Sequence, residues 1–213
     1  MRRYYPVFLD LRGRPVVVIG GGQVALGKVQ GLLDAEAQVT VVSPELHPTL
    51  AQLAQEGKIR HLARPYMPGD LRGYALAFVA TDDRSINAQV AQEGRKLGVW
   101  VNAVDDPANC DFIMPAVVRK GGITVAISTG GGSPAMARKL REELERFLSD
   151  ELASMLELAA QVRQHLREKG IFVDAETWNR ALDRELLELL KRGLREEART
   201  RLLTTLLGQK GKD

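Results

Sequence analysis

The sequence predicts an α/β protein in which a parallel sheet is followed by a β-hairpin and helix and then by a small all-helical part. Three observations favour this class. Strand-like and helix-like segments alternate through the first half of the chain, which is typical of βαβ units with right-handed crossovers. A glycine-rich turn follows the first apolar run. After Asp105 a hairpin signal and then helical spacing replace the alternation.

The first half begins with a strand that should be buried on both faces, because PVVVI (15–19) is continuously apolar and β-branched. Further strands are expected where short apolar runs recur, and helices where apolar residues take helical spacing. The expected strands are 15–19, 38–43, 58–65, 74–82 and 99–104, and the expected helices are 20–36, 45–57 and 84–98.

The second half predicts a hairpin and then helices. Two β-rich runs flank RKGG within 113–129, which is a hairpin signal. The helix expected over 130–148 has Ser133 as a suitable N-cap and Pro134 at its first position. Residues 150–207 are expected to be helical, with breaks at Gly170 and Gly193, and the tail from Gly208 to be frayed.

These segments predict three domains. Residues 1–112 are expected to form an α/β domain, 113–149 a dimerisation region and 150–213 a helical C-terminal domain. A hairpin with one helix is too small to make its own core, and an isolated hairpin is marginal in water. A second copy of the chain is the natural partner surface, so we expect a homodimer.

Composition excludes several classes of protein. Cys110 is the single cysteine in 213 residues, so an intrachain disulfide framework is impossible and a reducing, cytoplasmic location is expected. No apolar run is long enough to span a bilayer, and the first residues lack the apolar core of a signal peptide. We therefore expect no membrane association.

The net charge and the number of histidines and cysteines further restrict the kinds of ligand that the chain is expected to bind. A net charge of +3 and 5% aromatic residues give little support for nucleic-acid binding, although a mild basic excess is compatible with an anionic small molecule. The three histidines and one cysteine are widely spaced, so no resident metal site is predicted.

The strongest local signal is the segment GGGQVA (20–25), which matches G-x-G-x-x-A between a strand and a helix. This is the Rossmann dinucleotide fingerprint. Gly20 allows the tight turn, Gly22 lets the backbone approach a pyrophosphate, and Ala25 lets the helix pack closely on the strand. The helix N-terminus favours phosphate charge. We predict a bound dinucleotide; the alternative is a purely structural glycine turn.

The end of the second strand bears on the choice of dinucleotide. An acidic residue that binds the ribose of NAD commonly stands there, whereas this chain has Ser43, followed by Pro44 and Glu45. Glu45 is close enough to bind a ribose, but an acid at a helix start also has an ordinary explanation. No arginine follows immediately to hold a 2′-phosphate, which favours NAD over NADP without deciding between them.

Polar residues also end the fourth and fifth strands. Thr81 and Asp82 follow one, and Asn102 and Asp105 end the other, so all should face the crevice at the carboxyl edge of the sheet. Asp83 could be a helix cap. A carboxylate at the position of Asp105 can act as a general base or orient a cationic substrate. The alternative is a turn aspartate that accepts bonds from nearby N–H groups.

A second glycine-rich loop, STGGGSP (128–134), leads into the next helix. It resembles an anion-binding nest for a carboxylate or phosphate, and a flexible turn with a capped helix is the alternative. Arg138 in the helix would suit an acidic ligand. Of the residues that remain, we expect Lys28 to be solvated and Cys110 to be a small packed side chain.

Together these residues resemble a known family. The segments YPVFLDLRGRPVVVIGGGQVALGKV, VTVVSPEL, ATDD, VNAVDDPANCDFIMPAVV and ISTGGGSPAMARKLR follow, in order, the pattern of the siroheme-synthase N-terminal family. That family comprises precorrin-2 dehydrogenases and sirohydrochlorin ferrochelatases. The resemblance covers about residues 4–147.

The resemblance implies NAD-dependent oxidation of precorrin-2, a tetrapyrrole polycarboxylate, to sirohydrochlorin. Some members also insert Fe²⁺, which is then a second substrate. Asp105 falls on the family's key aspartate. The family's NAD contacts fall on Gly22, Gln23, Val24, Ser43, Pro44 and Glu45. The fingerprint and the end of the fourth strand add Gly20, Thr81 and Asp82 to the expected cofactor-binding residues. The family's serine-glycine loop falls on residues 128–134, which implies that Ser128, Gly131 and Ser133 bind substrate. From their positions we add Asn102 and Arg138 to the expected substrate-binding residues.

Two departures and two alternatives accompany this interpretation. Gly27 stands where family members commonly carry arginine, and the methyltransferase domain fused to some members is absent, so uroporphyrinogen methylation is not expected. One alternative is another NAD(P)-linked reductase of small metabolites. The other is an NAD(H)-sensing regulatory module that binds cofactor without turnover.

Overall fold

The computed structural model describes residues 3–208 of the chain in two compact units. The first unit is Tyr4–Met114, and the second contains the described residues from Pro115 onward together with Arg3. The predicted tail lies outside the described residues except for Gly208, which follows the last helix. The division of the second unit into a dimerisation region and a helical domain stays a prediction.

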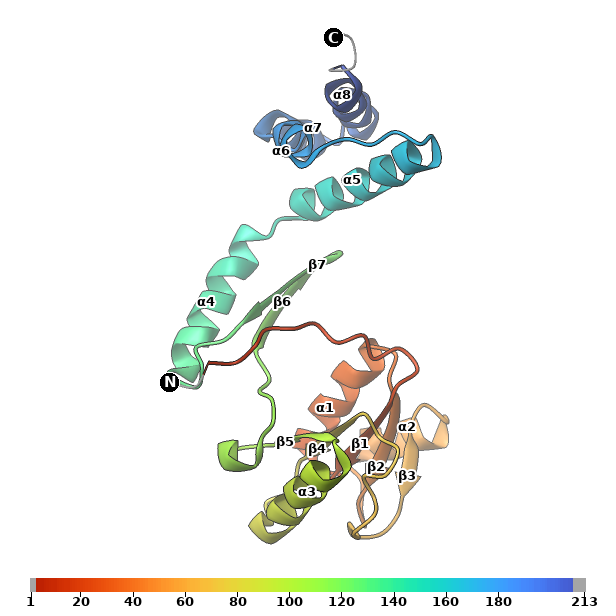
Figure 1. Cartoon of the computed structure of the whole chain (residues 1–213), viewed down its shortest axis with the longest axis vertical. Helices are drawn as coiled ribbons and strands as arrows, with labels where there is room; N and C mark the ends of the chain where they lie inside the picture. The colour runs from red at the N-terminus through yellow and green to blue at the C-terminus, as the bar shows by residue number, and fades with distance from the viewer. Residues whose placement is uncertain (1–2, 209–213) are drawn as a thin grey trace. The chain divides into compact units, whose positions relative to one another are not determined.

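The first unit is built on a five-stranded parallel sheet in the order β3-β2-β1-β4-β5 (Figure 1). Its strands are β1 (Pro15–Ile19), β2 (Gln38–Val42), β3 (Arg60–Leu62), β4 (Leu76–Val79) and β5 (Trp100–Ala103). The strand order reverses between β1 and β4, and ligands of open α/β sheets bind outside the carboxyl ends of the strands at such a point.

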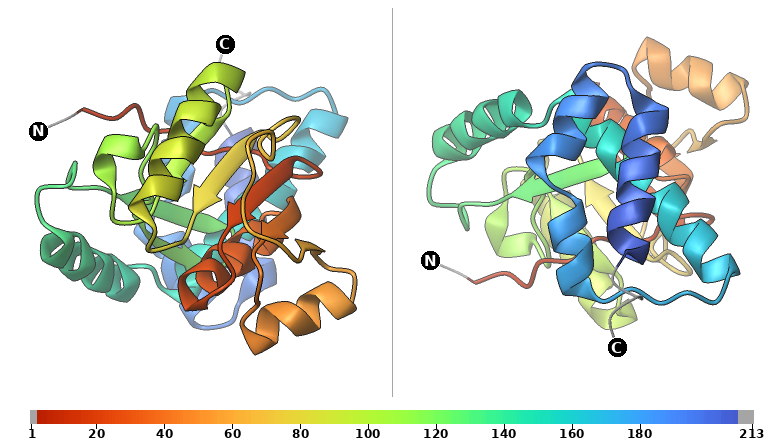
Figure 2. Two further views of the ribbon diagram at one scale, coloured as in Figure 1. Left: turned by 90° about the horizontal axis from the view of Figure 1, so that it is seen from below. Right: turned by 90° about the horizontal axis from the view of Figure 1, so that it is seen from above.

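Helices cover both faces of this sheet (Figure 2). Helices α1 (Gln23–Asp34) and α2 (Pro48–Gln55) pack on the face that carries Val16 and Val18. Helix α3 (Arg84–Leu97) packs on the opposite face, which carries Val17 and Ile19. Successive side chains of a strand point to opposite faces, so the continuous apolar run of β1 is what burial on both sides requires.

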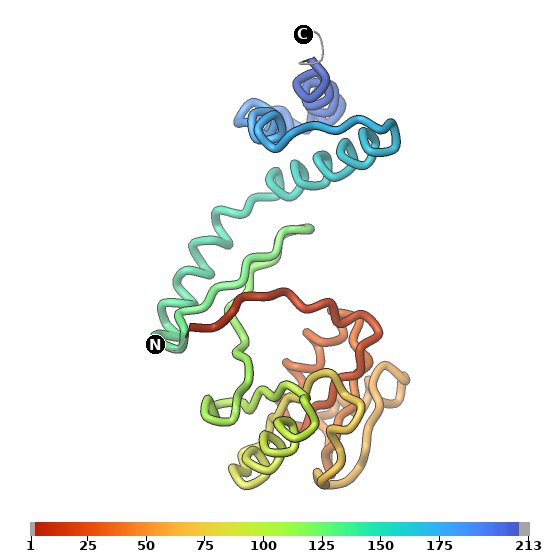
Figure 3. Tube along the Cα trace, viewed as in Figure 1, coloured from red at the N-terminus to blue at the C-terminus, as the bar shows by residue number. Residues whose placement is uncertain are grey.

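Every strand of this sheet except β1 is shorter than the sequence predicts. β3 ends at Leu62 because the chain turns there, where the Arg64 N–H donates to the Leu62 carbonyl at 2.8 Å. The Arg64 guanidinium then forms two hydrogen bonds with Asp70, at 2.6 and 2.8 Å, which fold the following loop on itself. Residues 4–14, ahead of β1, form neither helix nor strand (Figure 3).

The second unit begins with the predicted hairpin. Strands β6 (Ala116–Lys120) and β7 (Ile123–Ile127) are antiparallel, and Gly121 of their two-residue turn has a φ of 52°. Helix α4 (Pro134–Phe147) packs along β6. As predicted, Ser133 caps α4, because its Oγ accepts a hydrogen bond from the Met136 N–H at 3.1 Å. None of the residues of α4 is buried.

The chain ends in a helical cluster around Leu158, Leu186 and Leu202. Its helices are α5 (Asp150–Glu168), α6 (Ala175–Ala181), α7 (Arg184–Lys191) and α8 (Arg195–Leu207). Gly170 and Gly193 follow α5 and α7 with positive φ, as expected of helix ends. Within residues 3–208, no helix has the length and apolar character that crossing a membrane requires.

Candidate active site

Gly20 brings the carboxyl ends of three strands together. Its φ is 111°, and a Cβ added there would lie 2.3 Å from the Ala80 carbonyl oxygen at the end of β4. Its N–H donates to the carbonyl of Val42, at the end of β2, at 2.9 Å. Only glycine has both the conformation and the space for this position, which agrees with its predicted role in the tight turn.

Gly21 has a structural role that the fingerprint does not reveal, because the motif leaves this position open. A Cβ on Gly21 would lie 2.1 Å from the carbonyl oxygen of Glu45, in the loop after β2. The Gly21 carbonyl accepts a hydrogen bond from the His47 N–H at 2.7 Å. The glycine-rich turn therefore packs directly on the neighbouring loop, a contact that residue spacing alone cannot indicate.

The start of α1 fits a dinucleotide. Gly22 is its N-cap and supplies no side-chain cap, and a Cβ there would meet nothing within 4 Å. The first N–H groups of α1 thus face open space at the positive end of the helix dipole, which suits a pyrophosphate. Gln23 and Val24 are exposed beside them, whereas Ala25 is fully buried against the sheet, as predicted.

Ser43 shapes the loop after β2. Only 8% of the residue is exposed, and its hydroxyl donates to the Glu45 carbonyl at 2.6 Å. The backbone carbonyl of Ser43 lies 2.8 Å from His61 Nε2. Pro44 and Glu45 are exposed. The carboxylate of Glu45 is therefore the accessible polar side chain of this loop, while the Ser43 hydroxyl is used within the loop.

The loop after β4 leads directly into α3. The Thr81 Oγ1 accepts from the Asp83 N–H at 3.2 Å. Asp83 caps α3 by accepting from the N–H groups of Ser85 and Ile86, at 2.8 and 3.3 Å. The helix-cap interpretation of Asp83 is thus correct. Asp82, between these two residues, is exposed at the carboxyl edge of the sheet.

Asp105 lies just beyond β5, and its backbone is in the left-handed region with a φ of 57°. Its side chain is exposed. The turn around it is held by its neighbours, since the Asp106 N–H donates to the Ala103 carbonyl at 3.3 Å and Asn109 Nδ2 donates to Asp106 Oδ2 at 2.8 Å. A non-glycine residue with this φ is uncommon and often marks a functional position.

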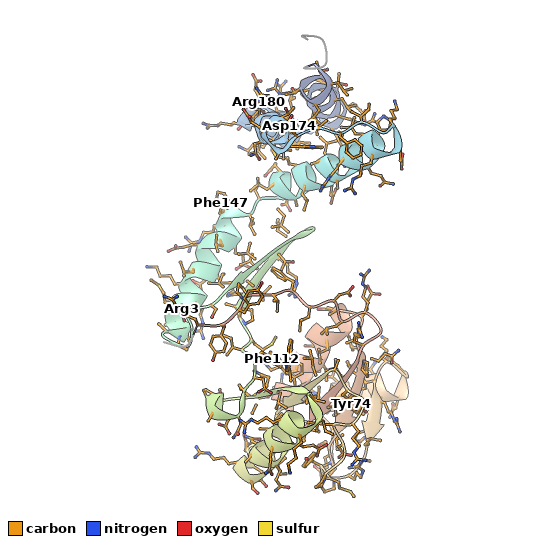
Figure 4. The ribbon with its side chains drawn as sticks, viewed as in Figure 1. Arg3, Tyr74, Phe112, Phe147, Asp174 and Arg180 are labelled. Carbon is orange, nitrogen blue, oxygen red and sulfur yellow. The ribbon has the colours of Figure 1, made fainter. Side chains whose placement is uncertain are left out.

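Asn102 is buried beneath this turn. Only 6% of the residue is exposed, and its Nδ2 donates to the Phe112 carbonyl at 2.8 Å. Phe112, which Figure 4 labels, packs edge-on against Phe78 of β4, with ring centroids 5.5 Å apart. The side chain predicted to contact a substrate is instead engaged inside the protein, where it ties the segment after β5 back to that strand.

Cys110 and Lys28 complete the surroundings of Asp105. The Cys110 thiol donates to the Ala103 carbonyl at 3.0 Å, and burial raises its pKa, so Cys110 is the packed side chain that the sequence predicts. Lys28 of α1 is half-buried, so the expectation of a solvated lysine is wrong. Burial lowers the pKa of Lys28, and the nearby Asp105 carboxylate opposes that change.

The second glycine-rich loop belongs to the second unit. Gly130 and Gly131 have φ values of 61° and 83°, and the Gly130 N–H donates to Ser128 Oγ at 3.1 Å. Ser133 is engaged as the cap of α4, while Ser128, Gly131 and Arg138 are exposed. Across residues 3–208, no cluster of three or more His, Cys, Asp or Glu side chains could hold a metal ion.

Comparison with known proteins agrees with this geometry. Residues 7–116 match the family model described as "Putative NAD(P)-binding", and residues 120–146 match the model described as "Sirohaem biosynthesis protein central". The first match covers the parallel sheet with its glycine-rich turn and Asp105. The second covers most of the hairpin, the second glycine-rich loop and most of α4.

Curated relatives carry the name siroheme synthase. The protein of Methylococcus capsulatus is 40% identical over 202 residues, which are 94% of this chain and 43% of that protein. The protein of Methylobacillus flagellatus is 43% identical over 164 residues, which are 77% of this chain and 35% of that protein. The chain therefore spans less than half the length of these relatives.

A solved structure resembles the whole chain. The protein titled "SirC, precorrin-2 dehydrogenase" superposes with a TM-score of 0.75 at 25% identity, covering 95% of this chain and 98% of its own. The predicted fold class is confirmed by this match and by the observed sheet topology. The chain belongs to the NAD(P)-binding family whose model it matches, and its predicted resemblance to the siroheme-synthase family is confirmed.

Proposed function

We propose that the chain catalyses the NAD-dependent oxidation of precorrin-2 to sirohydrochlorin, a step toward siroheme. The observation that carries the proposal is Asp105, an exposed carboxylate in a left-handed conformation that follows β5 at the same carboxyl edge of the sheet as the glycine-rich turn after β1. The relatives named siroheme synthase and the likeness to a precorrin-2 dehydrogenase support the same reaction.

The reaction separates a hydride from a proton. One C–H bond of the reduced macrocycle breaks with its electron pair, a proton leaves a neighbouring position, and a new double bond forms. NAD⁺ supplies the hydride acceptor when bound. The Asp105 carboxylate, exposed at the carboxyl edge of the sheet, accepts the proton as the general base.

The residues proposed to hold NAD surround the switch between β1 and β4. Gly22, Gln23 and Val24 present backbone N–H groups to the pyrophosphate, and Glu45 binds the adenosine ribose. Gly20 and Ser43 shape the two loops, and Thr81 with Asp82 borders the nicotinamide end. An exposed carboxylate at the ribose position favours NAD over NADP, because it would repel a 2′-phosphate.

The residues proposed to hold the substrate are charged or hydrogen-bonding, as a polycarboxylate requires. Ser128, Gly131 and Arg138 are exposed in the second glycine-rich loop and α4, and they could bind substrate carboxylates. Ser133 caps α4, so its part is to orient this loop. Asn102 acts indirectly, because it holds the turn that carries Asp105.

We further propose a homodimer formed through β6, β7 and α4. A two-stranded sheet is marginally stable by itself, and α4 buries none of its residues within the described structure. Apolar side chains on α4 remain exposed, among them Phe147, with 68% of its surface accessible. A second copy of the chain would cover this surface.

Two further expectations accompany the proposal. Insertion of Fe²⁺ into sirohydrochlorin would use Asp105 to accept pyrrole protons. An anaerobic assay with sirohydrochlorin and Fe²⁺ tests this insertion, and a rate equal to that without enzyme would exclude it.

The cytoplasmic location is a prediction that rests on the single cysteine, and fractionation of cells tests this location.

The proposed reaction is tested by mixing the chain with NAD⁺ and precorrin-2 without oxygen and following the absorbance of NADH and sirohydrochlorin. We expect both products to appear together, and Asp105→Asn to abolish them while NAD⁺ affinity is kept. Cofactor binding without turnover would favour the NAD(H)-sensing module. Oxidation of another small metabolite, with precorrin-2 untouched, would favour a different reductase.

A further inference from the structure

His61 lies next to the loop that is proposed to bind the adenosine ribose. It is the middle residue of β3, an edge strand of the sheet, and it pairs with Val41 of β2. Its side chain is partly buried, and its Nε2 lies 2.8 Å from the backbone carbonyl oxygen of Ser43. A carbonyl oxygen only accepts hydrogen bonds, so the Nε2–H of His61 is the donor.

This hydrogen bond takes the place of a backbone bond of the sheet. The Ser43 N–H donates to the Leu62 carbonyl at 3.2 Å, so a continued parallel ladder would bring the Arg64 N–H to the Ser43 carbonyl. The Arg64 N–H instead donates to the Leu62 carbonyl at 2.8 Å, where β3 ends. The His61 side chain therefore supplies the donor that the backbone of the strand no longer provides.

The Ser43 carbonyl stands at the start of a restrained loop. Ser43 is only 8% exposed, and its hydroxyl donates to the Glu45 carbonyl at 2.6 Å. Pro44 between them has a φ fixed by its ring and also restricts the backbone of Ser43. On the side of α1, the Gly21 carbonyl accepts from the His47 N–H at 2.7 Å. A shift of Ser43 would therefore be passed on to Glu45, whose carboxylate is exposed.

We propose that His61 is a positioning residue that sets the choice of dinucleotide. By holding the Ser43 carbonyl, it keeps the Glu45 carboxylate where that group binds the adenosine ribose and repels a 2′-phosphate. This inference rests on the proposed function, since it concerns the residue proposed to bind the ribose of NAD. His61 acts through the loop 43–47 and takes no part in hydride or proton transfer.

The hold of His61 on the loop is tested without any ligand. Hydrogen exchange of the His47 amide, which donates to Gly21, is followed by NMR in the ¹⁵N-labelled full chain. In His61→Leu we expect this amide to exchange about fivefold faster or more, because the Ser43 carbonyl loses its donor. His61→Gln, whose side-chain amide is also a donor, should restore most of the protection.

The Val99 amide is the control for this exchange measurement. It donates to the Gly94 carbonyl, next to the opposite edge strand β5, and reports any general loss of stability. We expect its exchange in His61→Leu to match that in the parent chain. An unmoved His47 amide, or equal acceleration of the His47 and Val99 amides, would overturn the inference.

The effect on dinucleotide choice is tested by titrating NAD⁺ and NADP⁺ into the full chain in a calorimeter. We expect His61→Leu to weaken NAD⁺ binding about fivefold or more and NADP⁺ binding less, so that the preference for NAD⁺ falls. His61→Gln should keep most of the preference. Arg60→Gln, at the exposed residue before His61 in β3, is the matched control and should bind both dinucleotides as the parent chain does.

A double substitution shows whether His61 acts through Glu45. Glu45→Gln removes the charge, so His61→Leu in that background should change the preference for NAD⁺ by no more than about twofold. A full additional loss in the double variant would overturn the inference, since the two residues would then act independently. Equal losses of preference in His61→Leu and His61→Gln would also overturn it, because the hydrogen-bond donor would then not matter.

These outcomes keep the inference apart from the proposed function. If the parent chain does not bind NAD⁺, or if Glu45→Gln binds both dinucleotides as the parent chain does, the proposed cofactor site fails. The exchange of the His47 amide then still decides whether His61 holds the loop. If NAD⁺ binds and its preference is the same in the parent chain and in His61→Leu, the inference fails while the proposed function stands.

Discussion

Asn102 and Phe112 are joined by a hydrogen bond from Nδ2 to the backbone carbonyl oxygen at 2.8 Å, and this bond closes the loop that carries Asp105. The loop leaves the edge strand β5 and returns to it, because the Asp111 N–H donates to the Val101 carbonyl at 2.8 Å. A carboxylate on an otherwise exposed turn thereby gains a fixed backbone, which a positioned general base requires.

Removal of this bond should cost stability and activity together. In Asn102→Leu the Phe112 carbonyl loses its buried donor, so we expect the free energy of unfolding to fall by about 1–3 kcal/mol. The kcat for precorrin-2 oxidation should also fall, because the Asp105 turn loosens. Urea unfolding and steady-state kinetics measure the two effects. Unchanged unfolding would contradict the structural role given to Asn102.

Gly20 and Gly22, which precede α1, should respond differently to replacement by alanine. Gly20→Ala should prevent stable folding of the sheet edge, since the new Cβ would lie 2.3 Å from the Ala80 carbonyl oxygen. Gly22→Ala meets no atom within 4 Å, so it should keep the thermal stability and lose NAD⁺ affinity. Calorimetric melting and NAD⁺ titration distinguish these results.

Gly27→Ala is the matched control on the same helix. A Cβ there also meets nothing within 4 Å, and alanine should stabilise the helix by about 0.5–1 kcal/mol with NAD⁺ affinity unchanged. If Gly22→Ala bound NAD⁺ as tightly as Gly27→Ala does, the dinucleotide would not approach the backbone at Gly22.

The pair formed by Arg64 and Asp70 should make stability sensitive to acid. The hydrogen bonds from Arg64 hold the pKa of Asp70 below its ordinary value of 3.8. A carboxyl with a lowered pKa in the folded state contributes stability above its unfolded pKa and loses it as the pH falls through the folded value. Urea unfolding at pH 7 and below pH 4 should therefore show a smaller acid loss in Asp70→Asn than in the parent chain. Equal losses in both proteins would exclude a contribution from this pair.

Cys110 should be an unreactive thiol. Burial raises its pKa, and its Sγ takes part in hydrogen bonds with Ala103, so the nucleophilic thiolate is scarce near neutral pH. Labelling with a disulfide reagent at pH 7.5 should be far slower in the folded chain than in urea. Rapid labelling of the folded protein would indicate that the Asp105 turn opens readily.

A single substitution that introduces a negative charge on α4 tests the proposed dimer surface. Phe147→Glu places a carboxylate among the exposed apolar residues of α4 and should convert a dimer into monomers in analytical ultracentrifugation. Phe172→Glu changes the phenylalanine in the loop between α5 and α6, which is 86% exposed, and should leave the dimer intact. A parent chain that sediments as a monomer would refute the homodimer itself.

The sequence predicts the parallel sheet well because burial on both faces requires continuous apolar strands, as in 15–19, and because helical spacing is unambiguous in α1 and α3. Gly20 and Ala25 behave as their motif implies, since that motif encodes local geometry. The hairpin can be predicted equally well, because a Gly-Gly pair between two β-branched runs is typical of a hairpin turn.

What the sequence does not reveal are contacts between distant segments. Gly21 meets Glu45, and Asn102 meets Phe112, only after the strands have assembled. The sequence predicts Lys28 in solvent because a lysine on an amphipathic helix is usually exposed, whereas its half-burial depends on how the assembled fold packs around α1. The caps Asp174 and Asp183 could have been identified, since each is an acid directly before a helix.

The central claim, that Asp105 accepts a proton beside bound NAD, is tested most directly by a crystal structure of the chain with both NAD⁺ and precorrin-2. We expect the Asp105 carboxylate to lie within hydrogen-bonding distance of the macrocycle position that loses its proton, next to the nicotinamide. A carboxylate that faces solvent away from both ligands would contradict the account and leave Asp105 as a turn residue.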